Sequence, residues 1–417
     1  MLHFWLGAII AASLVAAGCA GSEGTAADVA ERQTDGRGNE AAAESGPTGV
    51  RSDAEANKPP EAANDPAAAF PYVMEVVADR LNVPWDMDIA PDGRIFFTER
   101  PGQIRVIEQG KLLQEPVYQF GDPFFSRSEA GLLGIALDRD FSNNHYLYVY
   151  HTYREGGQTK NRVLRMVEQN NKTVVDKVLI DHLPGELNHD GGRIKIGPDG
   201  MLYITAGDAL DRPLAQNLSS LGGKILRIAP DGSIPPDNPF PGSPVYSLGH
   251  RNPQGLAWHP LTGKLFSAEH GNSAHDELNL IVPGANYGWP IVQGDGIPLT
   301  TGEDVQPGEG PFTPPLVHSG TATWAPSGIA FITQGPWKGN LLVANLRGSQ
   351  LLRVILKEDF QTVQSVVPLF KDEFGRIRNV YEAADGSIYI MTNNRDGRGN
   401  PRGDDDKIIR FRPDARR

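Results

Sequence analysis

Short runs typical of β-strands follow tight turns at six places along the chain. Each turn supplies residues that tolerate positive φ, such as Asp-Gly, Gly-Lys or Asn-Asn, and each run is alternating or apolar throughout. The six units are roughly fifty to seventy-five residues apart, and amphipathic helical spacing is hard to find between them. They are PDGRIFFTER from Pro91, FSNNHYLYVYHTY from Phe141, PDGMLYITAGD from Pro198, LTGKLFSAEHG from Leu261, WKGNLLVANLRG from Trp337 and ADGSIYIMTNN from Ala384.

A sheet unit that recurs at this spacing predicts an all-β fold, a β-propeller in which each unit forms one blade. We expect six blades of four strands. A pair of β-sandwiches is the alternative, but six similar hairpins favour radial repetition. In a propeller, loops from every blade meet at one end of the central channel, so residues far apart in sequence can share a site.

The first nineteen residues read as an export signal. Leu2 to Ala17 is mostly apolar and leads to Ala16-Ala17-Gly18-Cys19, which is similar to a bacterial lipoprotein cleavage site. Only His3, and no Lys or Arg, precedes the apolar run, so an ordinary cleaved signal or a membrane helix is the alternative. We expect a lipid on Cys19 and a membrane-anchored protein that faces the periplasm or the cell exterior.

Composition divides the remainder into a tether and a folded domain. Residues 20–69 hold almost no large apolar side chains, which predicts a disordered, acidic, Ala- and Gly-rich tether, and the propeller is expected over 70–413. The 47 Gly and 33 Pro of the chain fit many turns. A net charge of −12 argues against nucleic-acid binding, and a single Cys excludes an internal disulfide or a Cys-based metal site.

Two polar clusters offer groups for proton transfer and charge stabilisation. His189 lies in Asn188-His189-Asp190-Gly191-Gly192, a loop that can approach a ligand closely, and an imidazole suits proton abstraction. Asp208, at the end of the next run, could orient that ring. Arg251, in GHRNPQG, suits an anion clamp or an oxyanion stabiliser. A turn His bound to backbone and a plain surface turn are the alternatives.

Two further clusters suggest ligands of opposite charge. Glu269-His270-Gly271-Asn272, Asp276-Glu277 and the segment 286–290 place oxygen donors in irregular loops, as calcium requires, whereas the HExxH pattern of zinc sites is absent. Arg376 and Arg378 are two apart on a predicted strand and would point the same way, toward one polycarboxylate. A polar loop and two solvated arginines are the alternatives.

Together these segments resemble the quinoprotein sugar dehydrogenases, the family of soluble glucose dehydrogenase and aldose sugar dehydrogenases. The resemblance extends from about Leu81 to Asn393 and rests on several rare strings in family order. They are PWDMDIAPDGRIFFTERPGQIRVI, AGLLGIALDRDF, NHDGGRIKIGPDGMLYITAGD, GGKILRIAPDGSIPPDNPF, GHRNPQGLAWHP, AEHGNSAHDELNLIVPGANYGWP and RIRNVYEAADGSIYIMTN. The family fold is a six-bladed propeller.

The resemblance implies a set of roles. His189 is the general base, Asp208 supports it and Arg251 stabilises developing charge. Carbonyl oxygens of Gly271 and Asn272 hold the catalytic calcium, and Glu277 and Tyr287 match a second, structural calcium site. The residues expected to contact pyrroloquinoline quinone are Glu129, Arg251, Asn252, His270, Arg347, Arg376 and Arg378.

Three positions depart from the family pattern. Glu129 stands where the family usually has Gln, and a carboxylate there would repel a tricarboxylate unless it were protonated or turned toward a cation. Asn272 replaces a common Pro, which matters less because the expected ligand is a carbonyl. Arg347 replaces Lys and keeps the charge but not the shape.

The implied activity is oxidation of aldose sugars at C1 to lactones, by hydride transfer to pyrroloquinoline quinone with calcium. The electrons then pass to an acceptor that the sequence does not identify. One rival is a calcium-dependent propeller lactonase, which needs no quinone. The other is a propeller that binds sugar or protein and has lost catalytic activity. The carboxylate of Glu129, in place of the usual Gln, leaves this alternative open.

Overall fold

The structure is a computed structural model that describes residues 70–299 and 311–414. The expected signal peptide (1–19), its Cys19 and the expected tether (20–69) lie outside the described residues. Within the described ranges, no helix has the length and apolar character needed to cross a membrane.

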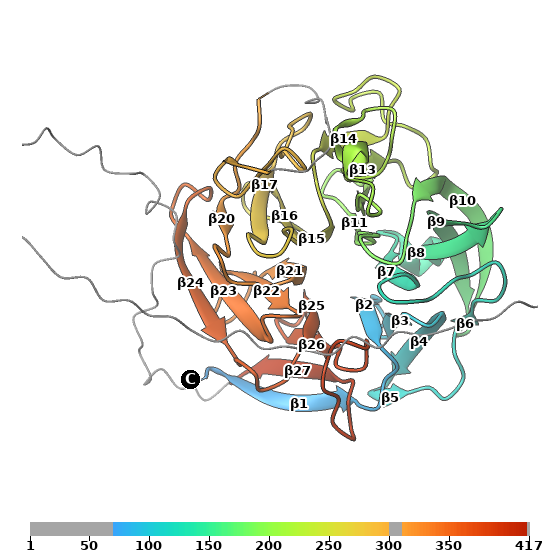
Figure 1. Cartoon of the computed structure of the whole chain (residues 1–417). Helices are drawn as coiled ribbons and strands as arrows, with labels where there is room; N and C mark the ends of the chain where they lie inside the picture. The colour runs from blue at the N-terminus through green and yellow to red at the C-terminus, as the bar shows by residue number, and fades with distance from the viewer. Residues whose placement is uncertain (1–69, 300–310, 415–417) are drawn as a thin grey trace, which may run out of the picture. The chain divides into compact units, whose positions relative to one another are not determined.

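Six antiparallel sheets of four or five strands are set around a common axis (Figure 1), which confirms the predicted six-bladed propeller. Blade 1 consists of β2 (Pro84–Ile89), β3 (Ile95–Glu99), β4 (Gln103–Glu108), β5 (Lys111–Leu112) and β6 (Tyr118–Gln119). Blade 2 consists of β7 (Leu132–Leu137), β8 (Tyr146–Glu155), β9 (Gln158–Gln169) and β10 (Lys172–Pro184), with helix α1 (Phe141–Asn144) ahead of β8. Blade 3 consists of β11 (Ile194–Ile196), β12 (Leu202–Ala206), β13 (Lys224–Ile228) and β14 (Val245–Leu248), with the 3₁₀ helix η2 (Arg212–Gln216) after β12.

The other three blades follow the same plan. Blade 4 consists of β15 (Pro253–Trp258), β16 (Leu265–Glu269), β17 (Glu277–Ile281) and β20 (Val317–His318), and a separate hairpin pairs β18 (Val292–Gln293) with β19 (Ile297–Pro298). Blade 5 consists of β21 (Pro326–Phe331), β22 (Leu341–Asn345), β23 (Gln350–Leu356) and β24 (Val363–Leu369). Blade 6 consists of β25 (Ile377–Glu382), β26 (Ile388–Thr392), β27 (Ile408–Pro413) and β1 (Tyr72–Ala78).

Blade 6 closes the ring, because it combines strands from both ends of the domain. The N-terminal strand β1 pairs with the C-terminal strand β27, in a register that runs from Tyr72 opposite Pro413 to Ala78 opposite Ile408. Closure leaves no gap between the first and last blades, so the sheet ring has no open edge at that point.

The second strand of most blades is buried on both faces, which explains why these runs are apolar throughout. In β3, Phe96 packs in the cluster between blades 1 and 2, and the next residue, Phe97, packs between blades 6 and 1. Successive side chains of a strand point to opposite faces, so one strand contributes to two interblade cores. Burial of each Phe side chain contributes about 1.5–3 kcal/mol.

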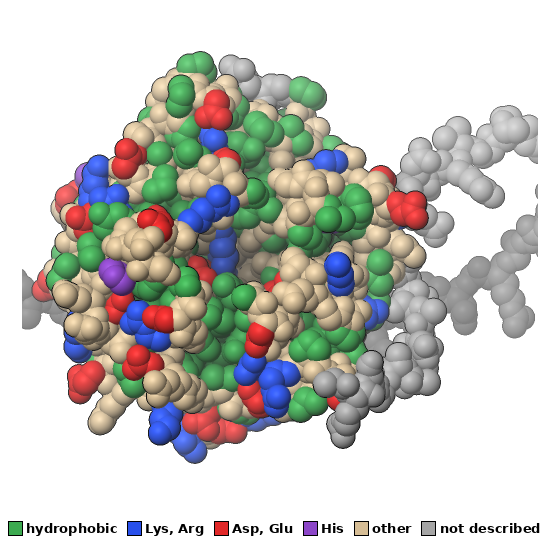
Figure 2. Space-filling view, turned by 180° about the vertical axis from the view of Figure 1, so that it is seen from behind, with side chains coloured by type: hydrophobic (Ala, Val, Ile, Leu, Met, Phe, Trp, Pro, Cys, Tyr) green, Lys and Arg blue, Asp and Glu red, His purple; other side chains and the backbone are tan. Residues whose placement is uncertain are grey.

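The turn ahead of the second strand uses the positive φ that the sequence predicts. Gly93 has a φ of 87° and Gly200 has a φ of 80° in the Pro-Asp-Gly turns ahead of β3 and β12. In blade 2 the short helix α1 takes the place of the Gly-containing turn ahead of the second strand. His145 ends this helix in the left-handed conformation, with a φ of 55°. The face drawn in Figure 2 is hollowed near its centre, and Lys and Arg side chains lie beside the hollow.

Candidate functional site

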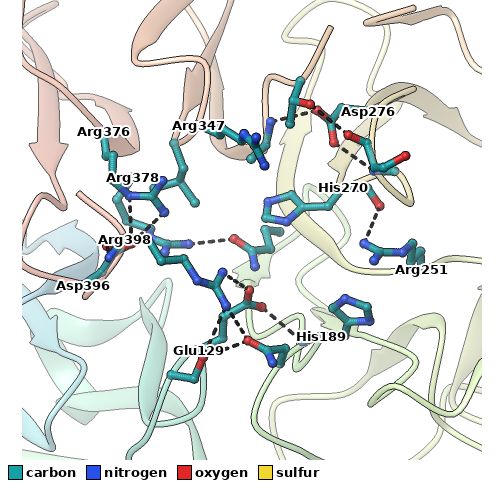
Figure 3. Close-up of a pocket in the computed structure, with 18 of the residues that line it drawn as sticks. Glu129, His189, Arg251, His270, Asp276, Arg347, Arg376, Arg378, Asp396 and Arg398 are labelled. Carbon is teal, nitrogen blue, oxygen red and sulfur yellow. Dashed lines mark hydrogen bonds and ion pairs between the residues drawn. The ribbon is translucent and has the colours of Figure 1, made fainter. Parts of the chain in front are cut away.

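Two kinds of loop supply the candidate residues, namely the loop that enters the innermost strand of a blade and the loop that follows its second strand. Loops that enter β7, β11, β15 and β25 carry Glu129, His189, Arg251 and Arg376. Loops that follow β3, β16, β22 and β26 carry Arg100, His270, Arg347 and Asp396. Because the blades are arranged radially, these loops meet around one cavity (Figure 3).

The cavity has a volume of about 410 Å³ and a basic lining. Its charged residues are six arginines, namely Arg100, Arg251, Arg347, Arg376, Arg378 and Arg398, and three carboxylates, namely Glu129, Asp276 and Asp396. Arginine therefore exceeds carboxylate by three charges in a chain whose net charge is −12. A local excess of this kind favours an anionic ligand.

His189 and Asp208, predicted as base and supporting acid, are in direct contact. Nδ1 of His189 lies 2.7 Å from Oδ1 of Asp208, and the Asp208 side chain is fully buried. The other Asp208 oxygen accepts a hydrogen bond of 2.8 Å from Nε1 of Trp289. The carboxylate therefore fixes the ring through Nδ1, which leaves Nε2 as the atom available to a ligand.

Arg251 lies at the wall of the cavity with much of its donor capacity unused. Its Nη1 and Nη2 lie 3.4 Å from the carbonyl oxygens of His270 and Asn272, and its Nε is buried without a hydrogen-bond partner. The guanidinium lies over the ring of Trp289, 5.2 Å from the ring centre. Burial lowers the pKa of Arg251, as expected for a cation whose charge is incompletely balanced.

Arg376 and Arg378 both line the cavity, but their charges are balanced differently. Arg376 donates from Nε and Nη2 to one carboxylate oxygen of Asp396, at 2.9 and 2.7 Å. Arg378 donates to the neutral amide oxygens of Gln254, at 2.7 Å, and Asn393. Burial lowers the pKa of Arg378 to about 9, which marks it as a cation that would gain from a nearby anion.

Two more arginines contribute donors without partners. Arg347, which stands where the family has Lys and is expected to contact the quinone, is exposed at the cavity. It makes no hydrogen bond or ion pair with another described residue. Arg100 was not predicted, and its buried Nε has no partner. The repeated unit could have identified Arg100, because Arg100 follows its strand just as His270 and Arg347 follow theirs.

Glu129, the residue that departs from the family pattern, is mostly buried and turned toward a cation. Its Oε1 lies 2.5 Å from Nη1 of Arg398, a residue that the sequence did not indicate. Burial alone would raise the Glu129 pKa, but the charges of His270 and Arg398 and the hydrogen bonds outweigh it and lower the pKa to about 2. Burial lowers the pKa of His270 to about 4, and its Nε2 has no hydrogen-bond partner.

Asn252, expected to contact the cofactor, lies behind the cavity wall. It is fully buried, its Oδ1 accepts the Gly191 main-chain N–H at 3.0 Å, and its Nδ2 donates to Glu129 at 3.3 Å. Both ends of the amide are therefore committed to neighbouring loops.

The loop that carries Gly271 is held by a buried carboxylate. Asp276 accepts the main-chain N–H groups of Gly271, Trp324 and Ala325, at 2.9, 2.6 and 2.9 Å. A Cβ on Gly271 would lie 2.0 Å from the carbonyl oxygen of Ala274, so only glycine fits. These contacts fix the main chain whose carbonyl oxygens the sequence assigns to calcium.

A second polar region, beside the cavity, contains acidic and amide oxygens. Glu277 is buried, and burial and the charge of Glu269 raise its pKa well above the usual range. Oδ1 of Asn279 and Oε1 of Gln293 are buried there without hydrogen-bond partners. A small cavity of about 10 Å³ lies between Glu269, Glu277, Tyr287 and Gln293.

This region has oxygen donors of the kind that calcium takes. The hydroxyl of Tyr287 donates to the carbonyl of Leu280 and accepts from the N–H of Val282, so it is already engaged with main-chain groups. Among the residues that the structure describes, no three His, Cys, Asp or Glu side chains come together as a metal site. A cation here would therefore depend on amide and main-chain oxygens as well as on carboxylates.

The fold and the cavity define a propeller protein with an arginine-rich cavity next to a His–Asp pair. The family model described as glucose / sorbosone dehydrogenase matches residues 81–409. The chain belongs to this family, whose members include pyrroloquinoline quinone-dependent glucose and aldose sugar dehydrogenases.

Named relatives cover most of the chain. It is 32% identical to quinoprotein glucose dehydrogenase B of Acinetobacter calcoaceticus, over 80% of this chain and 87% of that protein. Aldose sugar dehydrogenase YliI of Escherichia coli (strain K12) is 30% identical over 79% and 92%. The PQQ-bound aldose sugar dehydrogenase of Streptomyces coelicolor superimposes with a TM-score of 0.72, at 35% identity over 85% and 99%.

Proposed function

We propose that this protein oxidises aldose sugars at C1 to lactones and uses pyrroloquinoline quinone and calcium to do so. The observation that carries the proposal is the cavity in which arginine exceeds carboxylate by three charges, beside a His–Asp pair. The quinone is a tricarboxylate, so its charge matches this excess. The named relatives include quinoprotein and PQQ-bound sugar dehydrogenases, which supports the same assignment.

The chain's own groups fit the quinone by charge and by unused donors. Arg378 meets only neutral acceptors, and Arg100, Arg251 and Arg347 keep donors without partners. Carboxylates of the quinone would satisfy these donors, and bidentate arginine contacts would fix its orientation. Arg376 contributes less net charge because Asp396 already pairs with it.

The roles of the remaining residues follow from their positions. When bound, the quinone accepts the hydride that leaves C1 of the sugar. His189 takes the proton of the anomeric hydroxyl at Nε2, while Asp208 holds Nδ1 and stabilises the imidazolium that forms. Arg251 supplies positive charge where negative charge develops. A loss of both hydride and proton from the C1–OH unit gives the lactone.

Calcium is proposed for two places. The carbonyl oxygens of Gly271 and Asn272 would hold the catalytic ion, next to the cavity that they line. The acidic region around Glu277 and Tyr287 would hold the structural ion, since it offers carboxylate oxygens and two amide oxygens that lack partners.

Sugar-dependent dye reduction tests the function. The metal-free apo-protein is assayed with an aldose and a redox dye, with and without quinone and calcium. The proposal expects turnover only when both are added. Lactone hydrolysis with calcium alone would instead identify a lactonase, and sugar binding without either reaction would identify a binding module.

We also propose that the protein is exported and anchored by a lipid on Cys19. The support is the small-residue motif Ala16-Ala17-Gly18-Cys19 after an apolar run. Cys19→Ala should move the protein from the membrane fraction to the soluble fraction. Unchanged membrane partitioning of that variant would contradict the anchor.

A further inference from the structure

Arg398 joins three loops at the cavity. It belongs to the loop between β26 and β27, yet its Nη1 reaches Oε1 of Glu129, 269 residues away in the sequence, at 2.5 Å. Its Nη2 donates to Oδ1 of Asn188 at 2.5 Å and lies 3.3 Å from Oγ of Ser128. Figure 3 shows Arg398 between the blade 6 side of the cavity and the loops that carry Glu129 and His189.

The second oxygen of Glu129 is bound to the main chain of the candidate base. Oε2 accepts the main-chain N–H of His189 at 3.1 Å and lies 3.3 Å from Nδ2 of Asn252. His189 has a φ of 63°, a conformation that costs energy for a residue other than glycine and needs support from its surroundings. His189 is therefore held at two points, its main chain by Glu129 and its ring by Asp208.

The pair also changes what the cavity presents to an anion. The Glu129 side chain is only 14% exposed, so an unbalanced carboxylate there would act strongly on a ligand in the cavity. Among the described residues, the salt bridge of Glu129 is with Arg398. Arg398 is thus the cation that balances Glu129.

We propose that Glu129 and Arg398 act as one positioning unit, in which Arg398 neutralises the carboxylate and the carboxylate holds the main chain of His189. This inference rests on the proposed function, because the anion in question is the quinone. A lone carboxylate at Glu129 is expected to repel the quinone, but a carboxylate paired with Arg398 is not. Quinone binding should therefore weaken when Arg398 is removed, and the presence of Glu129 should not by itself weaken it.

Quinone binding in four proteins tests the neutralisation. The parent, Glu129→Gln, Arg398→Gln and the double variant are titrated with the quinone in the presence of calcium and without sugar. Arg398→Gln should weaken binding about tenfold or more, because it exposes a carboxylate to a tricarboxylate, and the double variant should return to within about threefold of the parent.

Arg402→Gln is the matched control. Arg402 lies in the same loop and donates no side-chain hydrogen bond to another described residue, so its loss removes an equal charge without affecting Glu129. It should change affinity by less than about threefold. Equal losses in Arg398→Gln and Arg402→Gln, or a double variant no better than Arg398→Gln, would overturn the proposal.

Turnover and unfolding test the positioning role. At saturating quinone, Glu129→Gln should lower kcat about tenfold with little change in the KM for sugar, since it weakens the hold on His189. A change in KM alone would overturn this role.

Unfolding of the apo-proteins separates the pair from the proposed function. Arg398→Gln should lower the thermal midpoint more than the double variant does, because it leaves a buried carboxylate without its cation. Additive effects would overturn the pairing. If the midpoints follow the expected order but the parent binds no quinone, the pairing is supported and the dehydrogenase function fails.

Discussion

Two polar regions lie side by side in this propeller, and they carry opposite charges. The cavity is lined by six arginines and three carboxylates, whereas the neighbouring region is built around the buried pair Glu269 and Glu277. Glu269 ends β16 and His270 follows it directly, so one residue step separates the two environments. Burial lowers the pKa of Arg378 on one side and raises that of Glu277 on the other.

Each region contains buried polar atoms that the described residues leave without hydrogen-bond partners. A basic cavity with unused guanidinium donors suits a polyanion, and an acidic pocket with unused amide oxygens suits a small cation. The propeller can form both regions because its radially arranged loops bring together charged residues that are far apart in the sequence. Pyrroloquinoline quinone and calcium are the anion and the cation that the proposed function requires.

His189→Ala should have the largest effect. Loss of a general base commonly costs roughly two to four orders of magnitude in rate, while quinone binding should persist because the arginines remain. The parent rate should rise with pH as the imidazole loses its proton, and this rise should vanish in the variant. A folded, cofactor-loaded His189→Ala protein with nearly the parent rate would transfer the role to Asp208.

Arg378→Gln tests the basic region next. The variant should bind the quinone about a hundredfold more weakly, because it removes a buried charge that donates hydrogen bonds only to neutral groups. The apo-protein should be at least as stable as the parent, since an unbalanced buried cation is lost. Equal quinone affinity in parent and variant, measured by titration, would contradict the assigned contact.

Glu277→Gln tests the acidic region. Calcium at about one hundred times its Kd should stabilise the parent by about 2.7 kcal/mol, and the variant should lose most of this gain. In chelator, the variant should unfold at a higher temperature than the parent, because burial and the charge of Glu269 disfavour an ionised carboxylate at this position and Gln carries none. Quinone affinity measured without sugar should serve as the control and change little.

Asp190→Asn should have the smallest effect, a gain in stability whose size depends on pH. Burial raises the Asp190 pKa to about 7 and its Oδ2 has no partner, so ionisation in the folded protein is costly. The stability of the variant relative to the parent should therefore grow from about pH 4 to pH 7 and then level off. A gain of about 2 kcal/mol is expected above pH 7 after the unpaired amide is allowed for. Urea unfolding of both proteins across this range measures it, and a constant difference would rule out the raised pKa.

Local rules made the fold predictable from the sequence. The Pro-Asp-Gly turns needed positive φ, and runs such as IFFTE needed burial on both faces, so six hairpins indicated six blades. Closure by β1 was not predicted, because its pairing with β27 joins strands that are far apart in the sequence. The five-stranded form of blade 1 was not predicted either.

The site was partly predictable for the same reason. His189 and Asp208 precede and follow strands of one blade, so their contact follows from the local hairpin. Arg398 could not be found in this way, since its partners Glu129 and Asn188 belong to other blades. The pairing of Arg376 with Asp396 follows the same hairpin rule, since Arg376 precedes β25 and Asp396 follows β26, although the sequence analysis did not draw it. The burial of Asn252 behind Glu129 could not be found, because it joins loops of two different blades.

The central claim is that the basic cavity binds the quinone, and a direct titration tests it. Metal-free apo-protein is titrated with pyrroloquinoline quinone, with and without calcium, at two salt concentrations and without sugar. We expect one quinone site per chain, with a Kd in the micromolar range or lower. Calcium should increase this affinity and salt should decrease it. No saturable binding at micromolar quinone with calcium present would contradict it.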